Sequence, residues 1–286
     1  MEFSKIISGV MTWGVWGKNL SEKQMVELIN ICFVNGINTF DHADIYGGYT
    51  TEASFGNAFI DSNIDREKIK LITKCGIASL EGRNYKIKHY NYSKEYIVWS
   101  VENALQNLKT DYLDALLLHR PSPLMISDEI AEAIQKLKTE GKIKSFGVSN
   151  FTPLQTELLN QKVKVEFNQI QFSATHFSSM IDGSLDFMQI HKITPMAWNP
   201  LGNVFRENNE QTQRLNKLLS LLELKYNASK EVLLLAWIMQ HPAGILPVIG
   251  TTNTGRIKIA VKATLLQLDL EDWFAIWTES AGQKVP

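Results

Sequence analysis

The feature that most constrains this chain is a regular alternation of short apolar runs with helix-like stretches. Between the runs, apolar residues recur three and four positions apart, which is the pattern of an amphipathic helix. Strands that alternate with helices pair in parallel, because each helix carries the chain back to the start of the next strand. We predict eight strands, over residues 6–11, 37–41, 69–74, 113–119, 143–149, 166–171, 194–199 and 245–250.

Capping and stop signals mark the predicted helices. Ser21 and Gln24 form a capping box at the start of one helix, which ends at Asn35-Gly36. A second helix begins at Ser93, and a third ends at Gly141. Further helical patterns cover about residues 152–160, 180–191, 212–226 and 229–240.

Eight strand–helix units in 286 residues fit a closed (β/α)8 TIM barrel. No change in composition marks a linker, so we expect one domain over residues 1–286. The structural alternative is an open, doubly wound sheet. Against it, no Gly-x-Gly-x-x-Gly motif follows an early strand.

Composition excludes several classes of protein. The chain has 29 Lys and Arg against 30 Asp and Glu, so its net charge of −1 favours neither nucleic acid nor a membrane surface as a partner. The longest apolar run, Val232–Met239, is far shorter than the roughly 20 residues of a membrane span. The first residues lack the apolar core of a secretory signal. Cys32 and Cys75 make neither a disulfide framework nor a metal cluster. We expect a cytoplasmic protein that is monomeric or at most weakly dimeric.

Polar side chains gather where the predicted strands end, the edge at which barrel enzymes carry catalytic groups. Asp41, Lys74 and His119 each end a strand, and Tyr46 follows Asp41 closely. Taken singly, such residues can be a turn cap, a solvated lysine or a core histidine. Together at one mouth they would have to pair with one another, because unpaired buried charges are costly. Later strand ends add Ser149-Asn150, Asn168-Gln169, Trp198-Asn199 and Thr251-Thr252-Asn253.

Four segments, at residues 40–47, 72–75, 118–121 and 147–151, resemble the aldo-keto reductase superfamily in the order in which they occur. The stretches at 118–125 and 196–202 are similar to a bacterial-type branch of predicted oxidoreductases. This resemblance implies a (β/α)8 barrel that transfers hydride reversibly between NADPH and a small aldehyde or ketone.

The resemblance also implies a catalytic tetrad of Asp41, Tyr46, Lys74 and His119. Tyr46 would be the general acid that protonates the carbonyl oxygen. Lys74 would lower the pKa of this phenol, and Asp41 would hold the lysine charge in place. His119 would donate a hydrogen bond to the carbonyl oxygen and orient the substrate.

The cofactor implied by the resemblance is NADP. Its nicotinamide and pyrophosphate would contact Met11, Thr12, Trp13, Asp41, Ser149, Asn150, Gln169, Trp198, Asn199, Pro200, Leu201 and Gly202. Its adenosine end would contact Gly250, Thr251, Thr252, Asn253 and Arg256, whose guanidinium suits a 2′-phosphate. Many family members have lysine at the position of Gly250 and polar residues at those of Ile259 and Ala260. These departures leave NAD possible as a cofactor.

The substrate pocket is less well defined. Six aromatic residues are candidates either for its walls or for anchors of the surrounding loops, namely Trp13, Tyr46, Tyr85, Tyr90, Tyr92 and Phe205. One alternative function is a catalytically weak NADP(H)-binding barrel that acts as a sensor or accessory subunit, which the intact tetrad disfavours. Another is an aldolase that forms a Schiff base on Lys74. Asp41 and Tyr46 beside this lysine would keep it charged.

Overall fold

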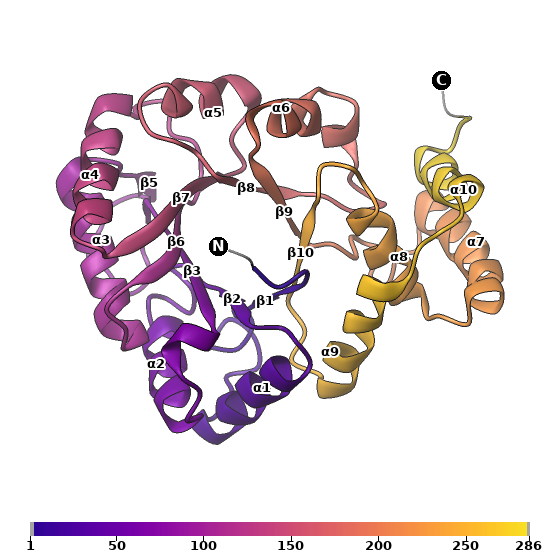
Figure 1. Cartoon of the computed structure of the whole chain (residues 1–286), viewed down its shortest axis with the longest axis horizontal. Coiled ribbons are helices and arrows are strands. Elements are labelled where there is room, and N and C mark those ends of the chain that lie inside the picture. The colour runs from indigo at the N-terminus through magenta and orange to yellow at the C-terminus, as the bar shows by residue number, and fades with distance from the viewer. Residues whose placement is uncertain (1–2, 285–286) are drawn as a thin grey trace.

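The computed structural model describes residues 3–284, and eight parallel strands in it close into a barrel (Figure 1). Strand β1 pairs with β2 on one side and with β10 on the other, which closes the sheet. The predicted (β/α)8 barrel is therefore confirmed, and the open doubly wound sheet is excluded. The strands are β1 (Ile7–Gly9), β2 (Thr39–Asp41), β3 (Lys70–Cys75), β6 (Leu113–Leu118), β7 (Ile143–Ser149), β8 (Phe167–Gln171), β9 (Thr194–Trp198) and β10 (Leu246–Ile249).

Helices surround the barrel and cover its outer face (Figure 1). The capping box of Ser21 and Gln24 opens α1, and the Ser93 hydroxyl caps α3 as the sequence predicts. The helices next to the strands are α1 (Glu22–Val34), α2 (Thr51–Asp61), α3 (Lys94–Leu108), α4 (Ser127–Thr139), α5 (Pro153–Asn160), α6 (Ser184–His191), α8 (Lys230–Met239) and α9 (Thr254–Val261).

The helical predictions need correction at α2 and α9, which no pattern marked, and at residues 180–191. Helix α2 has no side-chain cap and contains Gly56, so its sequence carries no clear helical signal. The glycine is needed because a Cβ there would lie 2.0 Å from the Asn107 carbonyl oxygen of α3. The helix predicted over residues 180–191 begins only at Ser184, because Gly183 before it has a φ of 84°, and Ser178–Met180 form a separate 3-10 turn.

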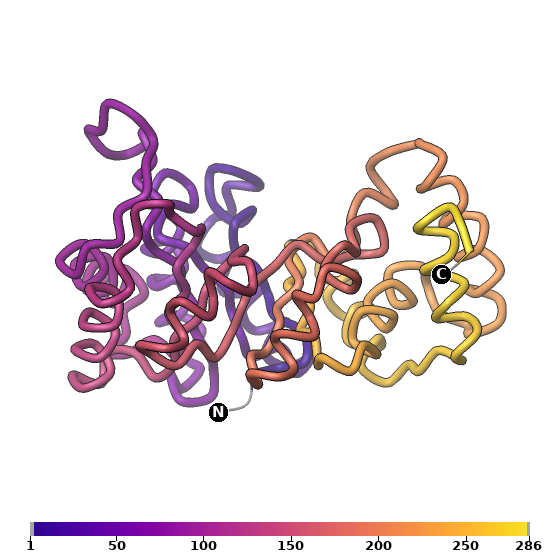
Figure 2. Tube along the Cα trace, turned by 90° about the horizontal axis from the view of Figure 1, so that it is seen from above, coloured from indigo at the N-terminus to yellow at the C-terminus, as the bar shows by residue number. Residues whose placement is uncertain are grey.

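Two further helices lie outside the barrel. Helices α7 (Glu210–Tyr226) and α10 (Leu270–Ala281) lie beyond α8, next to each other at one side of the molecule (Figures 1 and 2). The indole rings of Trp237 in α8 and Trp273 in α10 stack with centroids 5.2 Å apart. Each indole N–H also donates a hydrogen bond of 3.0 Å to the backbone oxygen of the other residue. This reciprocal pair holds α10 against the barrel.

A hydrophobic plug fills the inside of the barrel. It contains Phe3, whose ring lies 5.0 Å from that of Phe167 at the start of β8. Burying each such side chain contributes about 1.5–3 kcal/mol to stability. Because this plug fills the interior, the barrel is packed rather than hollow, and a site has to lie at its mouth. Its members are Phe3, Ile7, Ile72, Ala115, Leu117, Phe167, Met196 and Val248.

A small hairpin that the sequence did not predict stands at the carboxyl end of β3. Its strands β4 (Ile77–Ala78) and β5 (His89–Tyr90) are antiparallel, and the loop between them projects from the body of the molecule (Figure 2). Arg83 fastens this loop, because its guanidinium carbon lies 3.7 Å from the Tyr49 ring centroid. The same guanidinium donates a 2.9 Å hydrogen bond to the Tyr96 hydroxyl. No helix within residues 3–284 combines the length and apolar character of a bilayer-crossing segment.

Candidate active site

The structure brings Asp41, Tyr46, Lys74 and His119 together at the carboxyl ends of β2, β3 and β6. The Lys74 ammonium lies 2.7 Å from both Asp41 carboxylate oxygens and 3.3 Å from the Tyr46 hydroxyl. It also donates a 2.8 Å hydrogen bond to the His42 carbonyl. The rings of Tyr46 and His119 lie edge to face with centroids 6.1 Å apart. All four side chains are buried.

The turn after β2 explains how Tyr46 reaches Lys74. The Tyr46 amide donates a hydrogen bond of 3.1 Å to the Ala43 carbonyl, which reverses the chain direction. Gly47 and Gly48 follow with φ values of 61° and 63°, in the left-handed region that glycine adopts without strain. At Gly47, a Cβ would also lie 2.5 Å from the Thr51 hydroxyl oxygen. The turn therefore needs glycine here to hold the phenol over β3.

Charge in this cluster is set by burial and by pairing. Burial alone would lower the pKa of Lys74, but the Asp41 carboxylate and Tyr46 outweigh it and raise the pKa, so Lys74 is an ammonium. Burial raises the pKa of Tyr46, and the opposing effect of Lys74 is smaller. Lys74 acts on the Tyr46 pKa in the expected direction, but desolvation of the phenolate is the larger effect, so the net pKa lies above its usual value. Tyr46 is a neutral phenol that can donate a proton.

His119 is a neutral imidazole in this environment. Burial, followed by the charges of Lys74 and Arg120, holds the pKa of His119 well below its usual range. Its Nδ1 has no hydrogen-bond partner among residues 3–284. A neutral histidine has one donor and one acceptor nitrogen, so His119 can still donate to a carbonyl oxygen.

A chain of hydrogen bonds connects the ends of β7, β8 and β9 to the tetrad. The Trp198 indole donates to the Asn150 side-chain oxygen at 2.9 Å, and the Asn150 amide donates to the Ser149 hydroxyl at 2.7 Å. The Ser149 hydroxyl donates to the Gln169 carbonyl at 3.0 Å. The Gln169 side-chain amide then donates to Asp41 at 2.9 Å. Four side chains predicted to contact nicotinamide thus form one network with Asp41.

The turn after β9 is packed tightly against the segment after β8. Pro200 is buried and Leu201 is half-buried, between Asn199 and Gly202, whose φ values are 53° and 55°. A Cβ on Gly202 would lie 2.1 Å from the Thr175 hydroxyl oxygen and 2.6 Å from that of Ser173. Sequence reasoning missed both hydroxyl residues, because they belong to an irregular segment without a motif.

The segment after β1 decides between the two alternatives for Trp13, pocket wall or anchor. Met11 is exposed, and the hydroxyl of half-buried Thr12 donates a 2.9 Å hydrogen bond to the Gly250 carbonyl, which joins the ends of β1 and β10. Trp13 is fully buried against Phe40 and Phe55, so it cannot wall a substrate pocket.

Trp16 instead lies beside the tetrad, with its ring 6.2 Å from that of Tyr46. Its indole donates a 2.8 Å hydrogen bond to Glu81 in the hairpin loop. No sequence pattern marked Trp16. Tyr92 is a loop anchor rather than a wall, since it is buried and its hydroxyl is bonded to the Arg120 backbone. Tyr85 packs its ring against His89 within the hairpin, while Tyr90 and Phe205 are exposed.

Residues 250–256 form an exposed helix N-terminus. The Asn253 side chain accepts a 3.0 Å hydrogen bond from the Arg256 amide and caps α9. The Thr251 hydroxyl accepts from the Asn253 amide at 3.1 Å, and Thr252 beside it is half-buried. The Arg256 side chain is exposed and makes no ion pair within the described part of the chain. A helix N-terminus with a free guanidinium favours an anion.

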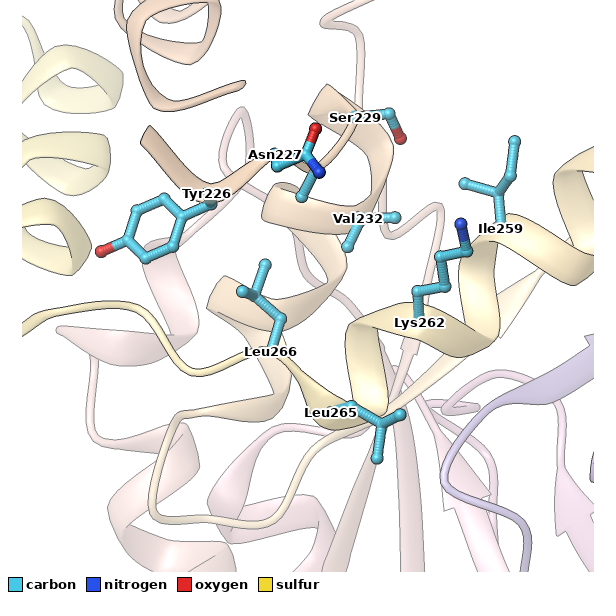
Figure 3. A pocket seen from close by; sticks show the side chains of 9 residues that line it. Tyr226, Asn227, Ser229, Val232, Ile259, Lys262, Leu265 and Leu266 are labelled. Carbon is cyan, nitrogen blue, oxygen red and sulfur yellow. The ribbon is translucent and has the colours of Figure 1, made fainter. Parts of the chain in front are cut away.

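A hollow of about 360 Å³ lies on the outer face near α9, away from the tetrad (Figure 3). It separates the α7–α8 turn from α9 and the 3-10 turn Lys262–Leu265. No tetrad residue lines it, so it is not the reaction site. Its lining residues are Tyr226, Asn227, Ala228, Ser229, Val232, Ile259, Lys262, Leu265 and Leu266.

Two more buried acids stand behind the tetrad. The Glu52 carboxylate accepts a 2.5 Å hydrogen bond from the Thr73 hydroxyl, and burial raises its pKa to about 7. Both Asp44 carboxylate oxygens lack a partner among residues 3–284, and burial, followed by Glu52, raises the pKa of Asp44 well above its usual range. Within the same residues, no group of three His, Cys, Asp or Glu side chains is arranged to hold a metal ion.

Comparison with known proteins identifies close relatives. The chain is 44% identical to the uncharacterized oxidoreductase YcsN of Bacillus subtilis over 293 aligned residues, which cover 100% of this chain and 97% of the relative. It is 39% identical to the oxidoreductase YdhF of Escherichia coli, over 100% of this chain and 96% of that protein. A 6-dehydroglucose reductase of Agrobacterium fabrum is 35% identical, with coverage of 100% and 97%.

Solved structures share the fold. The thermostable aldo-keto reductase Tm1743 superposes with a TM-score of 0.84 at 24% identity, over 98% of this chain and 96% of that chain. An aldo-keto reductase from Klebsiella pneumoniae, solved with NADPH, superposes with a TM-score of 0.79 at 24% identity, over 96% and 90%. The family model of the aldo/keto reductase family matches residues 5–279. The chain therefore belongs to the aldo/keto reductase family, as its motifs predict.

Proposed function

We propose that this protein reduces aldehydes or ketones to alcohols with NADPH, and that Tyr46 is the general acid. The observation that carries this proposal is the position of the Lys74 ammonium, 3.3 Å from the Tyr46 hydroxyl and 2.7 Å from the Asp41 carboxylate. Oxidoreductase names among relatives at 39–44% identity support the same reaction class.

The residues at the strand ends fit a dinucleotide. Asn168 has a buried side-chain oxygen without a partner among residues 3–284, next to the Gln169 network. Gly202 lets the turn after β9 pack closely against the Thr175 and Ser173 hydroxyls, which sets the course of the loop proposed to lie over the pyrophosphate. Arg256 and the N-terminus of α9 supply positive charge for a 2′-phosphate. Two solved neighbours from Klebsiella pneumoniae contain NADP or NADPH.

When bound, the nicotinamide would supply the hydride. Trp198, Asn150 and Gln169 would position its ring, since their side chains already form one network at the mouth. Negative charge would develop on the carbonyl oxygen as hydride adds to carbon. Tyr46 would give this oxygen its proton, and His119 would donate a hydrogen bond to it.

After the proton leaves Tyr46, Lys74 would stabilise the resulting phenolate. Its ammonium already contacts the phenol oxygen, and Asp41 prevents Lys74 from losing its own proton in the buried site. The raised pKa of Lys74 also disfavours the aldolase alternative, because a Schiff-base lysine must be unprotonated to attack a carbonyl.

The test is NADPH oxidation by the purified protein against a panel of aldehydes, ketones and sugar aldehydes. The last group is included because two relatives, at 35% and 31% identity, are named 6-dehydroglucose reductases. Tyr46→Phe removes only the hydroxyl, and it should lower turnover by at least about a hundredfold while NADPH still binds. Wild-type turnover in this variant would remove Tyr46 from its role. Tight NADPH binding without turnover by the wild type would support a sensor or accessory subunit instead.

A further inference from the structure

Arg120 follows the tetrad histidine at the end of β6, and its backbone is held in place. The Tyr92 hydroxyl donates a 2.5 Å hydrogen bond to the Arg120 carbonyl and accepts one of 3.1 Å from the Arg120 amide. Tyr92 is itself buried beneath the hairpin. Because both the amide and the carbonyl of Arg120 are held by Tyr92, the Arg120 side chain starts from a fixed position at the mouth of the barrel.

The Arg120 side chain reaches across the barrel mouth. Its guanidinium carbon lies 5.7 Å from the centroid of the Trp198 ring. Trp198 ends β9, and β7 and β8 separate that strand from β6 around the barrel. The side chain therefore extends over the space between the tetrad and the proposed nicotinamide position. Its charge helps to lower the pKa of both Tyr46 and His119, although burial is the largest influence on each pKa.

No carboxylate within residues 3–284 forms an ion pair with Arg120, although the residue is half-buried. At the same mouth, Asp41 is neutralised by Lys74, and Glu81 is bonded to the Trp16 indole. Lys88 adds a second positive charge that acts on His119. The open mouth thus carries positive charge that the described part of the protein does not compensate.

We propose that Arg120 determines specificity by binding a carboxylate of the substrate, so that the preferred substrates are carbonyl compounds bearing a carboxylate near the carbonyl group. This inference rests on the proposed carbonyl reduction. A guanidinium offers paired N–H donors that match the two oxygens of a carboxylate, and a partly desolvated site strengthens such a pair. A carboxylate bound there would hold the carbonyl carbon between Tyr46 and the ring that stacks on Trp198.

The experiment compares matched substrates that differ in one charge: succinic semialdehyde against butanal, and 3-carboxybenzaldehyde against methyl 3-formylbenzoate. In the wild type, kcat/KM should be at least about tenfold higher for each acid. Arg120→Gln should raise KM for the acids by about 10- to 100-fold and lower the ratio of kcat/KM for each acid to that for its neutral partner by about tenfold or more, so that an effect on both substrates alike cancels. For Arg120→Lys, KM for the acids should lie between the values of the wild type and Arg120→Gln, because an ammonium keeps the charge but lacks the paired donors.

Two controls distinguish direct binding of the carboxylate by Arg120 from the loss of any positive charge and from effects on turnover. Lys94→Gln removes an exposed charge of α3 and should behave as the wild type with all four substrates. Benzoate binding to the NADPH-loaded protein, followed by tryptophan fluorescence, gives a readout without turnover, and Arg120→Gln should weaken it.

The results distinguish the two proposals. If the wild type reduces neutral aldehydes with no preference for the acids, or if Arg120→Gln leaves the preference intact, the inference about Arg120 is overturned and carbonyl reduction stands. If no carbonyl compound is reduced, the proposed function fails. Benzoate binding then tests whether Arg120 binds a carboxylate, and equal binding by the wild type and Arg120→Gln would overturn that inference.

Discussion

The Gln169 side-chain amide donates a 2.9 Å hydrogen bond to the Asp41 oxygen that also receives the Lys74 ammonium. One carboxylate oxygen therefore connects the side chains that would hold the cofactor with those that would move the proton. A substitution at Gln169 or at Lys74 should therefore affect the hydrogen bond that the other residue makes, because both bonds depend on the orientation of the Asp41 carboxylate.

Asp41→Asn tests the charge pairing within the tetrad. The substitution leaves the buried Lys74 ammonium without its counter-ion, and breaking a buried pair in this way costs about 3–5 kcal/mol. We expect urea unfolding at pH 7 to show a loss of this size, together with strongly reduced NADPH oxidation. Glu132→Gln, which breaks the exposed pair with Lys94, is the control and should cost less than about 1 kcal/mol. Equal stability of the two variants would contradict the pairing.

Arg256→Ala tests the anion site at the N-terminus of α9. The guanidinium is exposed and has no partner within residues 3–284, so its loss should leave stability unchanged. We expect the ratio of kcat/KM with NADPH to that with NADH to fall about tenfold or more, because only NADPH carries the 2′-phosphate. The neighbouring Lys258→Ala is the matched control on the same helix. An unchanged ratio in Arg256→Ala would exclude this arginine from phosphate recognition.

Gly202→Ala tests the tight turn after β9. Its φ of 55° strains an alanine by about 1–2 kcal/mol, and the added Cβ would lie 2.1 Å from the Thr175 hydroxyl oxygen. Gly141→Ala is the control, since its φ is 69° but nothing lies within 4 Å of the added Cβ. Chemical denaturation should show a larger loss for Gly202→Ala, and only this variant should weaken NADPH binding. Similar losses in both would show that backbone strain alone matters.

Glu52→Gln tests a buried acid through the pH dependence of stability. The pKa of Glu52 rises from 4.5 to about 7 on folding, because burial disfavours its charged form. Between these values the native state holds a proton that the unfolded state has released, so stability falls as pH rises through this window. The full loss is about 3 kcal/mol for a shift of this size.

Unfolding free energies measured from pH 4.5 to 8 should therefore decline less in Glu52→Gln than in the wild type. The amide keeps an oxygen that can accept the hydrogen bond from Thr73. Glu132→Gln, at an exposed site, should reproduce the wild-type slope. Parallel curves for all three proteins would show that Glu52 is ionised at neutral pH.

Local patterns predicted most of the barrel. The spacing of apolar residues along one segment depends only on that segment, so six of the eight helices next to the barrel left a signal, all but α2 and α9. Helix α2 did not, because Gly56 serves a contact with α3 that no local pattern records. The same limit applies to the two tryptophans after β1: the sequence left Trp13 open as a pocket wall or an anchor, and packing against Phe40 and Phe55 buries it and leaves Trp16 near Tyr46.

The sequence by itself determined the fold class, the family and the four tetrad residue types, because strand ends in a parallel barrel meet at one rim. Only the tertiary structure decided the charge states at that rim. The raised pKa of Tyr46 follows mainly from burial, which depends on every element packed around the phenol. The position of Arg120 over Trp198 likewise joins β6 to β9 across the mouth. Such relationships depend on distances between segments far apart in the chain, and periodicity within a segment carries no information about them.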